Sequence, residues 1–293
     1  MKKLLLIDHN ALLHRSRSAL LRSGRRYTTA EGTPTTGIFS YLNCLLSIIK
    51  TQSPSHVIVT FDAGGNQRKQ GSDTYKANRK PPDPDFIIEN NILRDEALYA
   101  LGIESIGMRG YEADDLLYTF SHIAQFGMEK FDEVIIATVD QDLLQCVTER
   151  CAVLLWNGVK KQQLMWFNEV HEKWGCEPSD IRLVKALCGD TSDNIKGVRG
   201  IGPKTAVKLL TEASWDLSQA LKTEKVAPFA EQVMENLDLV TLKNMAGVLG
   251  PFRWDDYKVG LGMKSDYTEF LDKYEFTGLQ KRIEDTSAVL QLR

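Results

Sequence analysis

The stretch KLLLID, residues 3–8, decides the fold of this chain, because its pattern occurs again at two places. VIVTFD at 57–62 and VIIATVD at 134–140 are likewise apolar runs that lead into an aspartate. A continuous apolar run bounded by polar residues is typical of a parallel strand that is buried on both faces. We therefore expect strands at 3–7, 57–61 and 134–138, with a fourth at 151–155.

Helical patterns separate these strands, at about 36–50, 86–101 and 113–126. The alternation predicts an α/β fold with a mostly parallel central sheet flanked by helices. Ligands of such sheets bind beyond the carboxyl ends of the strands, where Asp8, Asp62 and Asp140 lie. The sequence thus predicts a functional site at this edge. After about residue 160 the pattern is mostly helical, with an amphipathic helix at 178–188.

The composition is that of an ordinary globular protein, with 43% apolar and 26% charged residues among 293. Five scattered cysteines without a C-x-x-C pair argue against a disulfide framework and against a zinc site. The apolar run after Lys3 is too short for a signal peptide, and no run reaches membrane-spanning length. We expect a cytoplasmic protein that makes no membrane contact.

The net charge of −3 does not by itself indicate a nucleic-acid-binding protein. The basic residues are grouped, however, along the chain. The groups are Arg15, Arg17, Arg22, Arg25 and Arg26, then Lys76, Arg79 and Lys80, and finally Lys196, Arg199, Lys204 and Lys208. One such group is usually a solvated surface, but three of them flanking a set of acids suit a polyanionic substrate.

Further acidic residues come in tight groups: YEADD at 111–115, DQD at 140–142 and DTSD at 190–193. Near a helix start, such residues often only complement the helix dipole. Nine carboxylates at one sheet edge would repel one another, and Mg²⁺ or Mn²⁺, which prefer oxygen ligands, would remove that repulsion. Two such ions can activate a water and stabilise the leaving oxygen of a phosphodiester. The sequence therefore predicts a metal-dependent phosphodiesterase.

These motifs, with YKANR at 75–79 and GVRGIGPKTA at 197–206, occur in the order of a known family. From residue 4 to about 210 the chain resembles the 5′-nuclease domain of bacterial DNA polymerase I and the free-standing flap endonucleases of bacteriophages. No polymerase domain follows, so we expect the free-standing form, in the host cytoplasm if the protein is phage-encoded. The resemblance implies a PIN-like nuclease core with a helical arch and a C-terminal helix–three-turn–helix DNA-binding region.

The resemblance also implies the activity. We expect a structure-specific, Mg²⁺-dependent flap endonuclease and 5′-3′ exonuclease of DNA replication and repair, which uses two-metal-ion catalysis and leaves a 5′-phosphate and a 3′-hydroxyl. The expected substrate is DNA with a free 5′ end, a flap or a junction. RNA–DNA hybrids, and with them the RNase H-like removal of RNA primers, are the main variant. We expect a monomer that binds two or more Mg²⁺ ions, for which Mn²⁺ can substitute.

The resemblance assigns roles to the matched positions. The first metal cluster is expected to comprise Asp8, Asp62, Glu112, Asp114 and Asp140, and the second Asp115, Asp142, Asp190 and Asp193, directly or through water. Lys76 and Arg79 of the arch are expected to stabilise charge on the scissile phosphate, as catalytic residues beside Asp114 and Asp140. Residues 1–177 would form the catalytic core, with the arch at about 63–100.

Residues 178–293 are expected to form a helical region that binds duplex DNA, with the helix–three-turn–helix at about 182–211. In that element, glycines and a helix N-terminus let the backbone approach phosphates. The expected DNA contacts are Arg15, Arg68, Tyr75, Lys76, Arg79, Lys185, Lys196, Gly197, Arg199, Gly200, Gly202 and Lys204, with Tyr75 stacking on an unpaired base. The family often holds K⁺ there through backbone carbonyls, which here would be those of Val198 and Ile201.

Alternatives remain at this stage. A PIN-like ribonuclease would be shorter and lack the glycine turn, a silent junction-binding protein would have lost carboxylates, and an aspartyl phosphatase would carry its D-x-D motif on the first strand. Two positions depart from the family: Gln67 stands where an aromatic residue is common, and His9 stands where glycine is usual. It could alter the turn after the first strand, bring an imidazole to the metals, or point away from them.

Overall fold

The central element of the structure is a six-stranded sheet with the strand order β3-β2-β1-β4-β5-β6. The computed structural model describes residues 1–65, 68, 71–72, 74–158, 161–261 and 267–291. The strands are β1 (Lys3–Asp8), β2 (His56–Thr60), β3 (Ser105–Ile106), β4 (Glu133–Thr138), β5 (Cys151–Trp156) and β6 (Gln162–Met165). All neighbours pair in parallel except β6, which is antiparallel to β5. The expected mostly parallel sheet, including its strand at 151–155, is confirmed.

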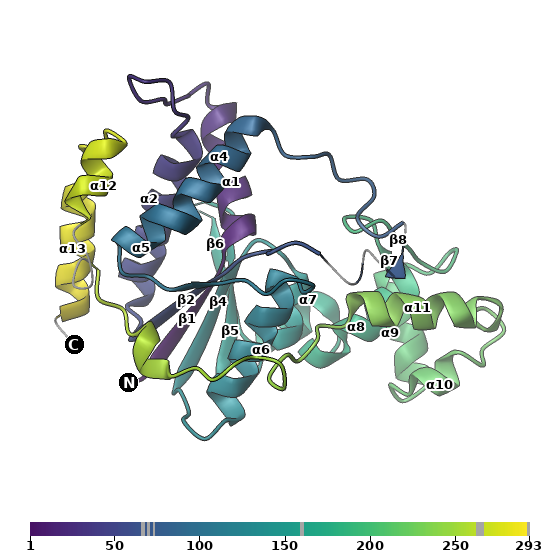
Figure 1. The fold of residues 1–293 in the computed structure, drawn as a ribbon. Coiled ribbons are helices and arrows are strands. Elements are labelled where there is room, and N and C mark those ends of the chain that lie inside the picture. The colour runs from purple at the N-terminus through teal and green to yellow at the C-terminus, as the bar shows by residue number, and fades with distance from the viewer. Residues whose placement is uncertain (66–67, 69–70, 73, 159–160, 262–266, 292–293) are drawn as a thin grey trace.

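Helices cover both faces of this sheet (Figure 1). Leu5 and Ile7 pack with α1 (His9–Arg22) and α2 (Thr36–Gln52), on the face that also carries α4 (Pro84–Ile92) and α5 (Leu98–Ala100). Leu4 and Leu6 pack with α6 (Ala113–Phe126) and α7 (Phe167–Trp174) on the other face. Because successive side chains of a strand point to opposite faces, one continuous apolar run supplies two cores.

The helix expected at 86–101 begins at Pro84 and is interrupted by a π-helical turn at Leu93–Ala97. Asp83 caps its start, because its side chain accepts a hydrogen bond from Phe86 N. The expected arch at about 63–100 includes residues 66–67, 69–70 and 73, which lie outside the described residues. Its described part consists of a turn at 74–78, α4, the π-helical turn and α5.

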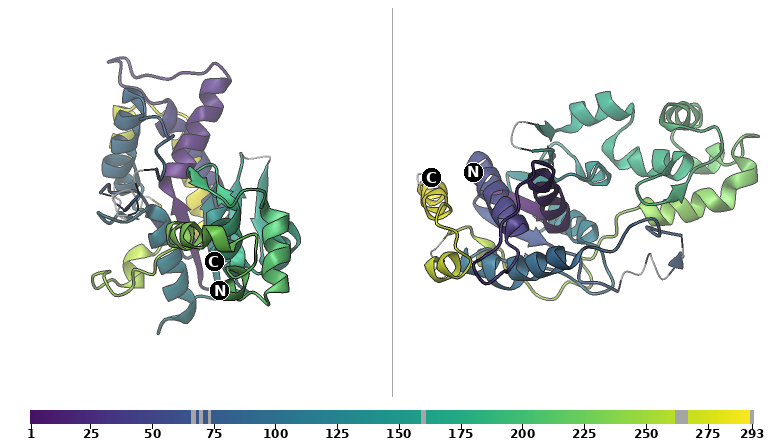
Figure 2. Two further views of the ribbon diagram at one scale, coloured as in Figure 1. Left: turned by 90° about the vertical axis from the view of Figure 1, so that its right-hand side faces the viewer. Right: turned by 90° about the horizontal axis from the view of Figure 1, so that it is seen from above.

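A helical region lies beside the carboxyl edge of the sheet (Figures 1 and 2). A short 3₁₀ turn (Pro178–Asp180) leads into α8 (Ile181–Cys188), and the small hairpin β7 (Gly189–Asp190) and β8 (Ile195–Lys196) follows. Next come α9 (Pro203–Glu212), α10 (Leu217–Ala220) and α11 (Ala230–Val240). Other 3₁₀ turns lie at Asp142–Cys146, Ala227–Phe229 and Trp254–Tyr257.

The last helices, α12 (Thr268–Lys273) and α13 (Gln280–Gln291), lie at the opposite end of the molecule from α8–α11. Phe270 and Ile283 share a core with Leu45 of α2. The division of the chain into residues 1–177 and 178–293 stays a prediction. Although α12 and α13 belong to the second of these parts, they pack against the sheet domain. In the described part of the chain, every helix is too short or too polar to cross a membrane.

The topology explains why the acidic edge forms. In the sheet, β2 lies on one side of β1, and β4, which comes later in the chain, lies on the other side. The carboxyl ends of β2, β1 and β4 are therefore adjacent, at the point where the strand order reverses. Asp8 ends β1, while Asp62 and Asp140 each follow their strand by two residues.

Candidate metal centre

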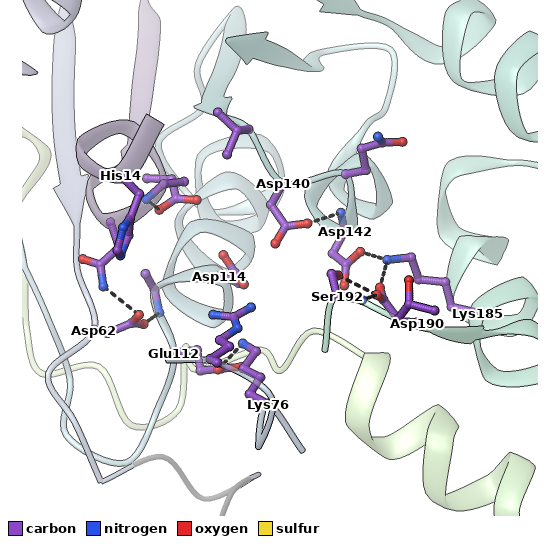
Figure 3. A pocket seen from close by; sticks show the side chains of 18 of the residues that line it. His14, Asp62, Lys76, Glu112, Asp114, Asp140, Asp142, Lys185, Asp190 and Ser192 are labelled. Carbon is purple, nitrogen blue, oxygen red and sulfur yellow. Dashed lines mark hydrogen bonds and ion pairs between the residues drawn. The ribbon is translucent and has the colours of Figure 1, made fainter. Parts of the chain in front are cut away.

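An open cavity of about 590 Å³ lies at this edge of the sheet. Seven of the nine predicted ligand carboxylates line it: Asp8, Asp62, Glu112, Asp114, Asp140, Asp142 and Asp190. In Figure 3, Asp114 and Asp140 lie between Asp62 on one side and Asp190 on the other. Lys76, Arg79 and Lys185 line the same cavity, so the predicted basic residues lie among the acids.

Local hydrogen bonds fix several of these carboxylates. Asp8 caps the start of α1 and accepts hydrogen bonds from Ala11 N (3.0 Å) and from the hydroxyl of Thr138 (2.7 Å). Asp62 accepts one from Ala113 N, at the start of α6, and one from Asn10 Nδ2, both at 2.8 Å. The start of each helix presents free N–H groups, which favour a carboxylate there. The helix N-termini thus orient the acids towards the cavity.

The electrostatics of the cavity favour a cation. Burial raises the pKa of Asp8 to about 7, against hydrogen bonds that lower it, and the charges of Asp62 and Asp140 raise it further. Burial, together with Asp140 and Asp8, raises the pKa of Asp114 well above its usual range, and burial raises that of Asp140. Neighbouring buried carboxylates whose pKa values are raised in this way would become fully charged beside a divalent cation. Their all-oxygen donor set fits Mg²⁺.

Basic side chains neutralise the rest of the cluster. Lys76 Nζ contacts Glu112 and lies 3.7 Å from Asp193, while Arg79 lies 2.7 Å from Asp193. Burial would raise the pKa of Glu112, but Lys76 and Arg68 hold it below its usual value. Among the described residues, no three side chains of the metal-binding types stand in a metal-holding arrangement. Metal binding by Glu112 or Asp193 would require these ion pairs to be exchanged for metal–oxygen contacts.

Asp115 and Asp193 do not line the cavity. Asp115 is 1% exposed and forms a two-pronged ion pair with Arg68, at 2.6 and 2.9 Å, and it also accepts from Lys243 N. Arg68, predicted as a DNA contact, is itself buried. The ring of Tyr75 is 4% exposed and its hydroxyl donates to Glu112. Metal binding by Asp115, DNA binding by Arg68 and base stacking by Tyr75 stay predictions, and each would require these contacts to break.

The remaining predicted contacts do not line the cavity. Arg15 on α1 donates to the carbonyl of Asn157 at 3.4 Å. Gly197 packs on the hairpin, where a Cβ would overlap the carbonyl of Cys188, so the backbone itself requires this glycine. Gly200, at φ +77°, and Gly202 face open space beside the exposed residues Lys196, Arg199 and Lys204. The carbonyl of Val198, a predicted K⁺ ligand, accepts a hydrogen bond from Ile201 N at 3.0 Å.

Sequence reasoning missed several residues of the cavity. Asn10 and His14 line it together with Asp8, and the i, i+4 spacing of Asn10 and His14 on one helix face was the available signal. Thr138, two residues before Asp140, bonds both Asp8 and Asp140 N. The imidazole of His9 points away from the carboxylates. It is fully buried between Tyr41 OH (3.1 Å) and Asn90 Oδ1 (3.0 Å).

Two family models match consecutive parts of this chain. The 5′-3′ exonuclease, N-terminal resolvase-like domain matches residues 3–175, and the 5′-3′ exonuclease, C-terminal SAM fold matches residues 176–259. The chain belongs to the 5′-3′ exonuclease family. The expected family and fold class are thereby confirmed, and the chain is a nuclease of this family.

Individual relatives agree with this assignment. The chain is 37% identical over 212 residues to the 5′-3′ exonuclease of Bacillus subtilis (strain 168), covering 72% of this chain and 70% of that protein. It is 33% identical to DNA polymerase I of Caldicellulosiruptor bescii over 96% of this chain, but it spans only 33% of that polymerase. The bacteriophage T5 D15 flap endonuclease, solved with DNA and metal ions, has the same fold, with a TM-score of 0.65, 19% identity and coverage of 99% and 100% of the two chains.

Proposed function

We propose that this exonuclease cuts DNA phosphodiesters at junctions of single and double strands, leaving a 5′-phosphate and a 3′-hydroxyl. The observation that carries the proposal is the gathering of seven carboxylates, from β1, α6, β7 and the segments after β2 and β4, in one cavity with Lys76, Arg79 and Lys185. A cavity lined by both acidic and basic side chains suits a nucleic-acid substrate. Its phosphates would bind the basic side chains and the metal ions held by the acidic ones.

Two or more Mg²⁺ ions, replaceable by Mn²⁺, are the proposed cofactors. Asp8, Asp62, Asp114 and Asp140, with Glu112, would hold one of them, and Asp142, Asp190 and Asp193 another, while Asp115 could join only by exchanging Arg68. Bound divalent ions would lower the pKa of an attacking water and stabilise the leaving oxygen. The bonds from Ala11 and Thr138 to Asp8, and from Asn10 and Ala113 to Asp62, would keep these ligands oriented.

The chain's own cations would bind the substrate. Lys76 and Arg79 line the cavity from the arch side, and Lys185 lines it from α8. Donors that flank the acidic centre can bind the scissile phosphate and stabilise the charge that develops on its oxygens. Because Lys76 and Lys185 are now bound to carboxylates, arrival of metal would release them for the phosphate.

The glycine turn and the start of α9 are the proposed duplex contact. Lys196, Arg199 and Lys204 are exposed around it and can bind phosphates without reading the base sequence. A K⁺ ion at the carbonyls of Val198 and Ile201, cutting of RNA–DNA hybrids, a role in replication and repair, a monomeric state and a cytoplasmic location remain predictions.

One assay tests this function. A 5′-labelled flap substrate is incubated with the protein and Mg²⁺, with and without EDTA, beside the same labelled strand alone and in a blunt duplex. We expect a short labelled product from the flap that requires the metal. Cutting that persists in EDTA would refute the metal centre. Binding of the flap without cutting in Mg²⁺ would instead favour a silent junction-binding protein.

A further inference from the structure

A polar cluster, buried at Arg17 and Glu89 and open to solvent at Asp83, joins α1 and α2 to the start and middle of α4. Arg17 of α1 donates two hydrogen bonds to the carboxylate of Asp83, at 2.9 and 3.0 Å. It donates a third, from Nε, to Glu89 of α4 at 2.5 Å. The second oxygen of Glu89 accepts the backbone N–H of Gly37, in the first turn of α2. We call Arg17, Glu89 and Asp83 the α4 anchor.

Two members of the α4 anchor are shielded from solvent. Glu89 is 0% exposed and the Arg17 side chain is 9% exposed, so their charges depend on each other, on Asp83 and on the N–H of Gly37. A Cβ on Gly37 would lie 2.7 Å from Glu89 Oε2, so glycine is needed at that position. Asn90, the next residue of α4, is hydrogen-bonded to His9. The contacts of Arg17 and His9 fix α4 to the helix that begins directly after Asp8, and the contact of Gly37 fixes it to α2.

The α4 anchor restrains Arg79, the proposed catalytic side chain, through the short chain segment between Arg79 and Asp83. Arg79 lines the cavity, and only Lys80, Pro81 and Pro82 separate it from Asp83. Four residues span at most about 14 Å, and the two prolines reduce the freedom of this segment further. Holding Asp83 in place therefore limits how far the backbone at Arg79 can move from the carboxylates, where Arg79 pairs with Asp193 at 2.7 Å. Phe86, one turn further on, stacks on His14, which lines the same cavity.

We propose that the α4 anchor positions Arg79 for cleavage, so that Asp83 and Arg17 act on the reaction without touching the substrate. This inference rests on the proposed role of Arg79 at the scissile phosphate. In this proposal, α4 is a rigid support, and the segment before Asp83 carries the side chains that contact DNA.

The test uses Asp83→Asn in the full chain. Removing Arg17 would leave Glu89 charged and buried, with a risk of unfolding, whereas the Asp83 side chain is 55% exposed. Asparagine can still cap α4, so the helix start is kept while the ion pair is lost. Asp85→Asn is the matched control, because it removes the same charge from an exposed residue of the same turn.

Cleavage of the flap substrate in Mg²⁺ is measured for Asp83→Asn, Arg79→Ala and the double variant, with thermal unfolding as the check of folding. We expect Asp83→Asn to lower kcat by roughly tenfold while KM changes less than about twofold, because a misplaced group affects the transition state most. In the Arg79→Ala background, Asp83→Asn should have almost no further effect. Asp85→Asn should cut like the unchanged protein.

Two results would overturn the proposal in different ways. If Asp83→Asn lowers kcat by its full factor in the Arg79→Ala background as well, the anchor does not act through Arg79, while the proposed function stands. If Arg79→Ala alone cuts at the normal rate, the role of Arg79 fails, and the anchor proposal fails with it.

Discussion

The ammonium group of Lys185 lies 2.6 Å from the carboxylate of Asp190, on the hairpin that follows its helix. Burial opposes ionisation of Asp190, but Lys185 and Ser192 lower its pKa to about 2, so it is charged at neutral pH. Lys185 also contacts Asp142, which lies after β4 of the sheet domain. This one lysine therefore joins the sheet edge to the helical region, at the point where the second metal cluster is proposed.

The carboxylates of that cluster can be tested one at a time. Asp142→Ala and Asp193→Ala should each lower flap cleavage by at least about 100-fold, because a charge that stabilises the transition state is lost. Junction binding, measured by fluorescence anisotropy in Ca²⁺, should stay within a few-fold of normal. Asp272→Ala, on exposed α12, is the control and should cut normally. Normal cutting by either of these two carboxylate variants would show that our ligand assignment is wrong.

The raised pKa of Asp8 predicts how stability depends on pH. A folded pKa of about 7, above the unfolded value near 4, means that the protonated carboxyl contributes stability at low pH that is lost as the pH rises through 7. In EDTA, the free energy of unfolding should therefore fall between pH 5 and 8. Asp8→Asn should be more stable than the unchanged chain at pH 8, by about 1 kcal/mol or more.

With Asp8 in the proposed metal centre, Mg²⁺ should reverse this loss, because it would bind the folded chain and would require the charged carboxylate. We expect Mg²⁺ at pH 8 to raise the unfolding temperature of the unchanged chain more than that of Asp8→Asn. Denaturation curves at the two pH values, with EDTA and with Mg²⁺, provide the measurement. Parallel pH dependence of the two proteins in EDTA would contradict the assignment to Asp8.

We expect substitution of Arg68 to lower the stability of the fold even when no DNA is present. Arg68→Met leaves the buried side chain of Asp115 without its ion-pair partner, which should lower the free energy of unfolding by about 3–5 kcal/mol. Arg253→Met breaks an exposed ion pair with Asp256 and should cost less than about 1 kcal/mol. Urea denaturation of both variants gives the comparison. Equal stabilities would mean that the buried pair does not hold the fold.

We expect the glycines of the turn to differ in how well they tolerate substitution by alanine. Gly197→Ala places a Cβ on the carbonyl of Cys188, so we expect a loss of about 2 kcal/mol or more, together with displacement of the hairpin that carries Asp190. Gly202→Ala meets open space at an ordinary φ of −95° and should cost less than about 1 kcal/mol. Thermal unfolding and flap cleavage test the pair. Equal losses would show that close packing at Gly197 is not the reason for its glycine.

The sequence by itself determined four strands of the central sheet, the helical stretches at 36–50, 86–101, 113–126 and 178–188 to within a few residues, and the acidic edge. Apolar runs and helical periodicity report local structure, and in a parallel sheet the carboxyl ends of strands must share one edge. Asp8, Asp62 and Asp140 could therefore be placed together without coordinates, and the cavity contains all of them.

Only the tertiary structure decided which charged partner each side chain meets. Asp115 is bound by Arg68, 47 residues away, and Glu89 by Arg17 across 72 residues, while His9 turns towards Tyr41 and Asn90. Such pairings depend on how helices from distant parts of the chain pack, and a local pattern contains no information about that packing. Polar groups enclosed by those contacts must find a partner among whatever neighbours the fold supplies.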